Sequence, residues 1–122
     1  MTIEDGRPHK RLEVWQRSMV LVKKIYHLTK GFPKNETYGL SSQMQRSVIS
    51  IPSNIAEGAA RKSKAEFLRF LNIAQGSLSE LDTQMELAYM LGYIDKKERE
   101  EILADFTTIF KMLSGLIRSL KG

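Results

Sequence analysis

The sequence predicts an all-α protein in which four helices form an antiparallel up-down-up-down four-helix bundle, with residues 1–122 making one domain. Four long segments carry apolar residues at alternating spacings of three and four, which is the repeat of one face of an α-helix. Short connections join these segments, and short connections make neighbouring helices antiparallel. No segment shows the strict alternation of apolar and polar residues that indicates a strand.

The first segment, from about Pro8 to Lys30, carries two apolar stripes. We expect the first stripe to face the core, and it consists of Leu12, Trp15, Met19, Val22 and Tyr26. The second lies about 120° around the helix and consists of Val14, Leu21, Ile25 and Leu28. Because one core needs only one stripe, the second band indicates an oligomer interface, although a neighbouring helix of the same bundle is an alternative partner. Gly31 and Pro33 should end this helix.

The second segment runs from about Thr37 to Ala60. Its inward stripe should consist of Leu40, Met44, Val48, Ile51 and Ile55. Pro52 interrupts this pattern. We expect either a kink or an early end of the helix there, because proline has no N–H to donate to the carbonyl of Val48.

Capping boxes open the last two segments, at Ser63 with Glu66 and at Asp95 with Glu98. Gly92 should cap the end of the third helix, and the simplest reason for Gly76 within it is close approach of another helix. The inward residues of the third helix should be Phe67, Leu71, Ala74, Leu78, Leu81, Met85 and Ala88. Those of the fourth should be Ile102, Phe106, Ile109, Leu113, Leu116 and Leu120.

The residue types present argue against a catalytic or metal centre. The chain has no cysteine, so it offers no thiolate, and a reducing, cytoplasmic compartment is expected. A carboxylate-bridged metal site in a helical bundle needs Glu-x-x-His pairs, and neither His9 nor His27 has a glutamate three residues before it. The longest apolar run near the N-terminus, residues 19–22, is too short to span a membrane. We therefore expect no enzymatic activity, metal, cofactor, small-molecule substrate or membrane.

A polar stripe on the second helix is the feature that a bundle alone does not explain. It consists of Arg46, Ser50, Asn54, Glu57 and Arg61, at spacings of four, four, three and four. One interpretation is a hydrogen-bonded and ion-paired seam against a neighbouring helix or subunit, and the other is a ligand or polyanion site. We favour the seam, because complementary charges on one face usually pair with each other.

The net charge of +5 is unevenly placed, since residues 1–62 hold eleven Lys and Arg against five Asp and Glu, and residues 63–122 hold eight against nine. Four basic residues lie around the start of the third helix, where free backbone amides and the helix dipole favour phosphate. These nucleic-acid-binding candidates for RNA or DNA are Arg61, Lys62, Lys64 and Arg69. The alternative is a structural or protein-interaction module whose charge only maintains solubility.

Several motifs are specific enough to indicate a family. They are Phe32-Pro33 with Glu36, Tyr38-Gly39-Leu40-Ser41-Ser42-Gln43, Ser50-Ile51-Pro52-Ser53-Asn54-Ile55-Ala56-Glu57-Gly58, Glu66-Phe67 with Phe70-Leu71, and Leu91-Gly92-Tyr93-Ile94. Over nearly the whole chain they closely resemble the four-helix-bundle proteins encoded in intervening sequences of bacterial 23S ribosomal RNA genes. More distantly, the chain is similar to the accessory variability determinant of diversity-generating retroelements, a basic pentameric barrel that works with a reverse transcriptase and RNA.

The resemblance implies a four-helix protomer, a ring-like homo-oligomer whose expected form is a pentamer, and an association with RNA. It implies no enzymatic activity and adds no catalytic residue. One departure weakens a polyanion site on the second helix. Where relatives carry paired arginines after Ser-Gln, this chain has Met44-Gln45-Arg46, of which only Arg46 is basic.

Overall fold

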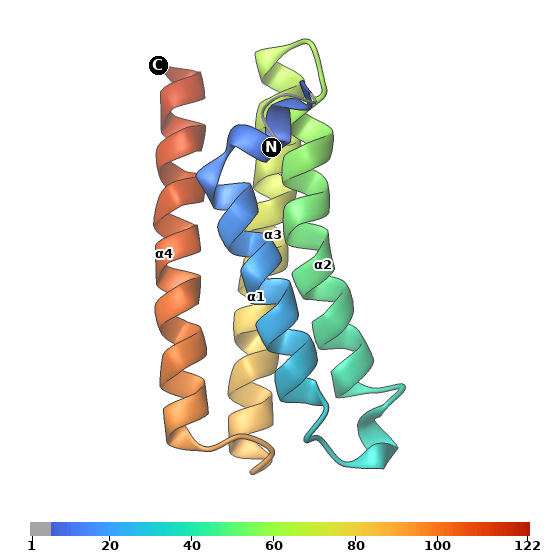
Figure 1. Ribbon diagram of the computed structural model, residues 1–122. Coiled ribbons are helices and arrows are strands. Elements are labelled where there is room, and N and C mark those ends of the chain that lie inside the picture. Colours follow the sequence, from blue (N-terminus) through green and yellow to red (C-terminus); the bar gives the residue numbers. More distant parts are fainter. Residues whose placement is uncertain (1–5) are drawn as a thin grey trace.

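The computed structural model describes residues 6–122, which form four long helices and two short 3-10 helices and contain no strand. The long helices are α1 (Glu13–Thr29), α2 (Leu40–Ala59), α3 (Lys64–Met90) and α4 (Lys96–Lys121), and the 3-10 helices are η2 (Pro8–Arg11) and η3 (Lys34–Glu36). The α1–α2 loop and the α3–α4 turn lie at one end of the bundle, and the α2–α3 turn and the last turn of α4 lie at the other (Figure 1). The contact between α2 and α3 is the most extensive, and that between α1 and α4 is the smallest of the four helix pairs in contact.

The core-facing side of α1 differs in part from the predicted one, although Leu12, Trp15 and Val22 pack partly against the core as expected. Met19 and Tyr26, predicted to face inward, are 45% and 37% exposed. The buried stripe instead consists of Val14, Ser18, Leu21, Ile25 and Thr29. Ser18 and Thr29 are tolerated there because their hydroxyls donate to the backbone carbonyls of Trp15 (2.8 Å) and Ile25 (3.0 Å).

The second apolar band of α1 is therefore the inward face of the helix. Val14, Leu21 and Ile25 are at most 5% exposed within one chain, and Leu28 is partly buried against the same core. The prediction that this band is an oligomer interface is wrong for Val14, Leu21 and Ile25, because side chains already covered by their own core cannot meet a second subunit. The number of apolar residues favoured the wrong face of α1 as the core-facing one. The buried face has fewer apolar residues because Ser18 and Thr29 complete its stripe.

The predicted stripe of α2 is confirmed, since Met44, Val48, Ile51 and Ile55 are fully buried and Leu40 packs partly against them. The helix does not end at Pro52, which is itself buried, but continues to Ala59. Packing of Ile55 beyond the proline stabilises the second half of the helix, since most helical stability in proteins comes from a buried apolar face.

The predicted capping box forms fully at α4 and only in one direction at α3, where the Glu66 carboxylate pairs with Arg69. Ser63 Oγ accepts a hydrogen bond from the Glu66 amide (3.1 Å), and the Asp95 capping box is complete in both directions. Gly92 adopts a φ of +79° after α3, which is the left-handed conformation that glycine adopts without strain.

The close approach expected at Gly76 occurs instead at Gly58. Apart from the adjacent residues and the backbone of its own helix, no atom lies within 4 Å of the place where a Cβ would stand at Gly76, whereas a Cβ at Gly58 would lie 2.8 Å from Phe70 Cβ and 2.9 Å from Phe67 Cδ1. The prediction for Gly76 is wrong, because its face of α3 points away from the other helices. Gly58 lets α2 approach α3 next to the turn that joins them.

Candidate nucleic-acid interface

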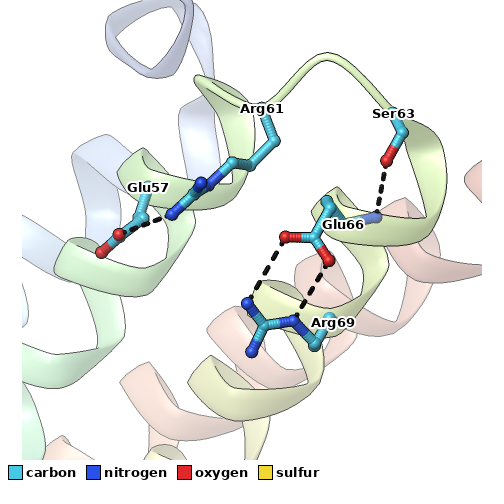
Figure 2. Close-up of polar contacts among 5 residues, drawn as sticks. All are labelled: Glu57, Arg61, Ser63, Glu66 and Arg69. Atoms are coloured by element: carbon cyan, nitrogen blue, oxygen red, sulfur yellow. Dashed lines mark hydrogen bonds and ion pairs between the residues drawn. The ribbon is translucent and has the colours of Figure 1, made fainter.

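The turn between α2 and α3 brings together the four predicted basic residues. Two of them are paired with carboxylates, since Arg61 Nη2 lies 2.9 Å from Glu57 Oε2 and Arg69 Nε lies 3.3 Å from Glu66 Oε2. Figure 2 shows both pairs, together with the Ser63 hydroxyl that accepts a hydrogen bond from the Glu66 amide at the start of α3. The Glu66–Arg69 pair lies within α3, whereas the Glu57–Arg61 pair joins the last turn of α2 to the turn that follows it.

Arg61 and Arg69 also cover the ring of Phe70, a motif residue that was not predicted to lie on the inward face of the third helix. Their guanidinium carbons lie 4.9 Å and 4.4 Å from the centroid of Phe70, which is only 7% exposed. At these distances each cation is attracted to the face of the ring. Both arginines therefore shield the buried end of the α2–α3 contact, in addition to any contact with a ligand. The spacings Glu57 to Arg61 and Glu66 to Arg69 were the signal that could have revealed the pairing.

Lys62 and Lys64 differ from the arginines. Both are exposed, and within residues 6–122 neither makes an ion pair or a side-chain hydrogen bond. They lie on either side of Ser63, directly at the N-terminus of α3, which is 27 residues long. Their ammonium groups are thus available to an anion at a helix end that already favours negative charge.

The polar stripe of α2 is divided between two kinds of contact. Ser50 Oγ lies 2.7 Å from Ser77 Oγ of α3, and Asn54 Nδ2 donates to the carbonyl and the hydroxyl of Ser50 at 2.8 and 2.9 Å. This part forms a hydrogen-bonded seam between α2 and α3. Glu57 and Arg61 pair with each other, and Arg46 is exposed at an open cleft of about 490 Å³ that Ser50 and Ser77 also line. The five residues therefore do not form one continuous site.

In the part of the chain that the structure describes, no group of three or more His, Cys, Asp and Glu side chains could hold a metal ion. The ring of His9 instead meets Trp15 edge to face, with 4.9 Å between the centroids. A second open cleft separates α1 from α4, where Lys24 Nζ lies 2.8 Å from Asp105 Oδ2. None of the helices in this described range is long and apolar enough to cross a membrane.

Comparison with known proteins identifies the family. The family model of the 23S rRNA-intervening sequence protein matches residues 10–115, which is most of the chain. The chain belongs to the 23S rRNA-intervening sequence protein family. A crystal structure of a protein of unknown function from the S23 ribosomal protein family of Bacteroides thetaiotaomicron is 30% identical, with a TM-score of 0.80. The alignment covers 86% of this chain and 95% of that one. A search of curated proteins found no match.

The range that matches the intervening-sequence family includes the α2–α3 turn with all four candidate residues, but not the last turn of α4. Some motif residues that carry the resemblance have a structural role in this chain. Tyr93 OH donates to Glu36 Oε2 (2.7 Å) and Gly58 allows contact between α2 and α3. Family membership therefore supports the fold directly, whereas the chemistry of the surface depends on this chain's own residues.

Proposed function

We propose that this member of the intervening-sequence family is a non-enzymatic accessory protein in the cytoplasm that associates with RNA through phosphate contacts. The observation that carries the proposal is the position of Lys62 and Lys64, which are exposed beside the N-cap of α3 and have no ion pair with any residue of the described range. The amides of the first helical turn and the positive end of the helix dipole favour phosphate at the same place.

The proposed contacts are to phosphates and not to base edges. Recognition of single-stranded RNA by sequence relies on exposed aromatic rings or arginine planes on which bases stack. At the α2–α3 turn the ring of Phe70 is already covered by Arg61 and Arg69. We therefore expect affinity with little sequence preference, and DNA should compete for the same surface.

We also propose that four-helix protomers of antiparallel topology assemble into a ring-like homo-oligomer, with a pentamer as the expected form. The support is the resemblance of the motifs and the apolar surface that remains exposed on the protomer. A ring would repeat the α2–α3 turn, so contacts that are individually weak would combine through multivalency.

A second candidate function is a protein-interaction module without a role in nucleic-acid binding. The observation that favours it lies at the end of α3, where Leu87, Met90 and Leu91 are 45%, 78% and 57% exposed. Exposed apolar residues that lie close together are typical of surfaces that bind another protein.

The test of RNA association is a Lys62→Gln, Lys64→Gln variant, with Lys96→Gln, Lys97→Gln as the matched control. Each pair lies beside the N-cap of a long helix and is exposed, but the control pair lies at the opposite end of the bundle. Binding of a single-stranded RNA is measured by fluorescence anisotropy as salt is raised. If both lysines contact phosphates, the slope of log affinity against log salt should fall by about 1.4 in the test pair, because each phosphate contributes about 0.7.

The control pair should leave the slope unchanged, and both variants should keep the helicity of the parent. Absence of binding by the parent protein at about 50 mM salt, where phosphate contacts are strong, would contradict the proposal and favour the interaction module.

A further inference from the structure

The positive charge of the described residues is concentrated in three segments that are far apart in the sequence. Residues 6–17, 57–69 and 114–121 together hold ten Lys and Arg against three Asp and Glu. The remaining described residues, 18–56 and 70–113, hold nine of each. The two acidic residues Glu4 and Asp5 lie outside the described range. The surplus of the described chain therefore comes entirely from these three segments.

The three segments lie at the same end of the bundle. In Figure 1, η2, the α2–α3 turn and the last turn of α4 are all drawn at or near one end, and the α1–α2 loop and the α3–α4 turn are at the other. We call the three segments the basic end. The sequence contrast between an N-terminal and a C-terminal half hides this, because Arg118 and Lys121 belong to the basic end although they come last in the chain.

A hydrogen bond shows which residues of α3 and α4 lie at the same height. Gln75 Nε2 donates to Ser114 Oγ at 2.9 Å. Arg118 and Lys121 follow Ser114 by four and seven residues, so they lie on the same side of α4 as Ser114, facing α3. Lys64 precedes Gln75 by eleven residues, which is three helical turns, so it lies on the matching side of α3. The end of α4 thus adds two cations on the side of α3 that carries Lys64.

Contacts also hold the N-terminal segment in place. The short helix η2 packs against both α1 and α2. Gln16 Nε2 donates to the carbonyl of Lys10 at 2.8 Å, and His9 rests on Trp15. Arg11, the last residue of η2, is exposed and is thereby positioned near the start of α1. The segment is a folded part of the basic end.

The acidic residues of the basic end do not neutralise its surplus. Glu13 pairs with Arg17 (3.3 Å), and Glu57 and Glu66 pair with Arg61 and Arg69. Each acid is thereby matched by one arginine. The exposed cations that have no such pair in the described chain are Arg11, Lys62, Lys64, Arg118 and Lys121. They are contributed by all three segments.

We infer that the basic end is one phosphate-binding surface, and that an RNA strand crosses the end of the bundle, from the α2–α3 turn to η2 and the last turn of α4. This inference rests on the proposed RNA association and extends its site to Arg11, Arg118 and Lys121. Helix axes in bundles lie about 8–10 Å apart, so the end is about 20 Å across. A surface of this width can contact several successive phosphates of one strand.

The test is the variant Arg11→Gln, Arg118→Gln, Lys121→Gln, compared with the control Lys34→Gln, Lys96→Gln, Lys97→Gln. Both remove three exposed positive charges, but the control residues lie at the opposite end of the bundle. The probe is a mixed-sequence single-stranded RNA titrated at several salt concentrations. The test variant should lower the slope of log affinity against log salt by about 2, and the control should leave it unchanged.

Glutamine keeps helical propensity, and circular dichroism with thermal melts checks that both triple variants fold like the parent. An unchanged slope in a folded test variant, together with the loss in the Lys62 and Lys64 variant, would overturn the extended surface and leave the proposed function standing. Equal loss of slope in the test and control variants would show that net charge alone matters, which also overturns the extended surface.

Failure of the parent to bind RNA would refute the proposed function itself. Competition by polyglutamate as strong as that by RNA of equal charge would overturn the assignment to nucleic acid.

Discussion

Glu36 joins separate parts of the chain at the end of the bundle opposite the basic end. Its carboxylate accepts a hydrogen bond from the Leu40 amide (3.0 Å) at the start of α2 and another from Tyr93 OH (2.7 Å) between α3 and α4. A Cβ at Gly39 would lie only 2.6 Å from Glu36 Oε1, so glycine leaves room for this carboxylate. The hydrogen bonds from the Leu40 amide and from Tyr93 OH lower the pKa of Glu36. The bond between Tyr93 and Glu36 also raises the pKa of Tyr93.

Acid should therefore weaken the fold through Glu36. Because its folded-state pKa is below the ordinary value of 4.5, the contact stabilises the protein above that pH and is lost as pH falls through the folded-state pKa. Two hydrogen bonds lower the pKa of Glu36, and Tyr93→Phe removes the one with the smaller effect on that pKa. Thermal melts followed by circular dichroism should show a lower Tm for the variant near pH 7, and a smaller loss of Tm on acidification. Identical pH profiles for variant and parent would argue against this role of Tyr93.

Among the helices, the contact of α2 with α3 depends on one glycine. Gly58→Ala places a Cβ within 2.9 Å of both Phe67 and Phe70, which are themselves packed against the core. Overpacking of this kind lowers the free energy of unfolding by about 1–3 kcal/mol. Urea unfolding measures the change.

Gly76→Ala is the matched control, because the added methyl meets nothing within 4 Å on an exposed side of α3. It should raise the free energy of unfolding by about 0.5–1 kcal/mol, since alanine replaces glycine within a helix. A gain in stability from both substitutions would mean that α2 and α3 adjust easily at Gly58 and that their approach is not limited there.

At the scale of the whole molecule, Leu21 and Ile25 are buried within one chain, so a contact between subunits needs another face. Gln45 Nε2 donates to Thr29 Oγ1 (3.1 Å), which places the start of α2 beside the end of α1. Tyr26 precedes Thr29 by three residues and Ile49 follows Gln45 by four, so both lie along the same seam. With Met19 they form an outer α1–α2 seam that is 37–45% exposed.

We expect Met19→Asp to reduce the oligomer mass measured by light scattering, while helicity is retained, because a carboxylate without a partner is costly in an apolar interface. Leu21→Asp should instead unfold the protomer, since Leu21 is 1% exposed within its own chain. A monomeric mass for the parent at micromolar concentration would contradict self-association. Retained helicity in Leu21→Asp would contradict the core assignment.

The sequence predicted which basic residues lie at the candidate site. It did not predict which carboxylates and which aromatic ring two of them contact. Lys62 and Lys64 follow from their positions beside the cap at Ser63, which is a local pattern. Arg61 and Arg69 were predicted as ligand residues, yet both are held by carboxylates one turn away and cover Phe70. The burial of Phe70 depends on how α2 meets α3, so sequence spacing alone could not reveal that these arginines also protect the core.

The sequence by itself determined that four helices form, where α3 and α4 begin and where α1 and α3 end, because caps, glycine and proline act on the nearest few residues. It did not determine the starts of α1 at Glu13 and α2 at Leu40, which were predicted at about Pro8 and Thr37, because neither N-cap residue, Leu12 or Gly39, contributes a side-chain cap. Only the tertiary structure decided which of two apolar bands of α1 faces the core, since Ser18 and Thr29 enter the buried stripe by bonding their own backbone. The antiparallel order of helices predicted from the sequence already places Arg11, Lys64 and Arg118 at one end, and the tertiary structure decided how near to one another they lie there. Their proximity depends on the heights at which helices distant in the sequence meet, as the contact of Gln75 with Ser114 shows for α3 and α4.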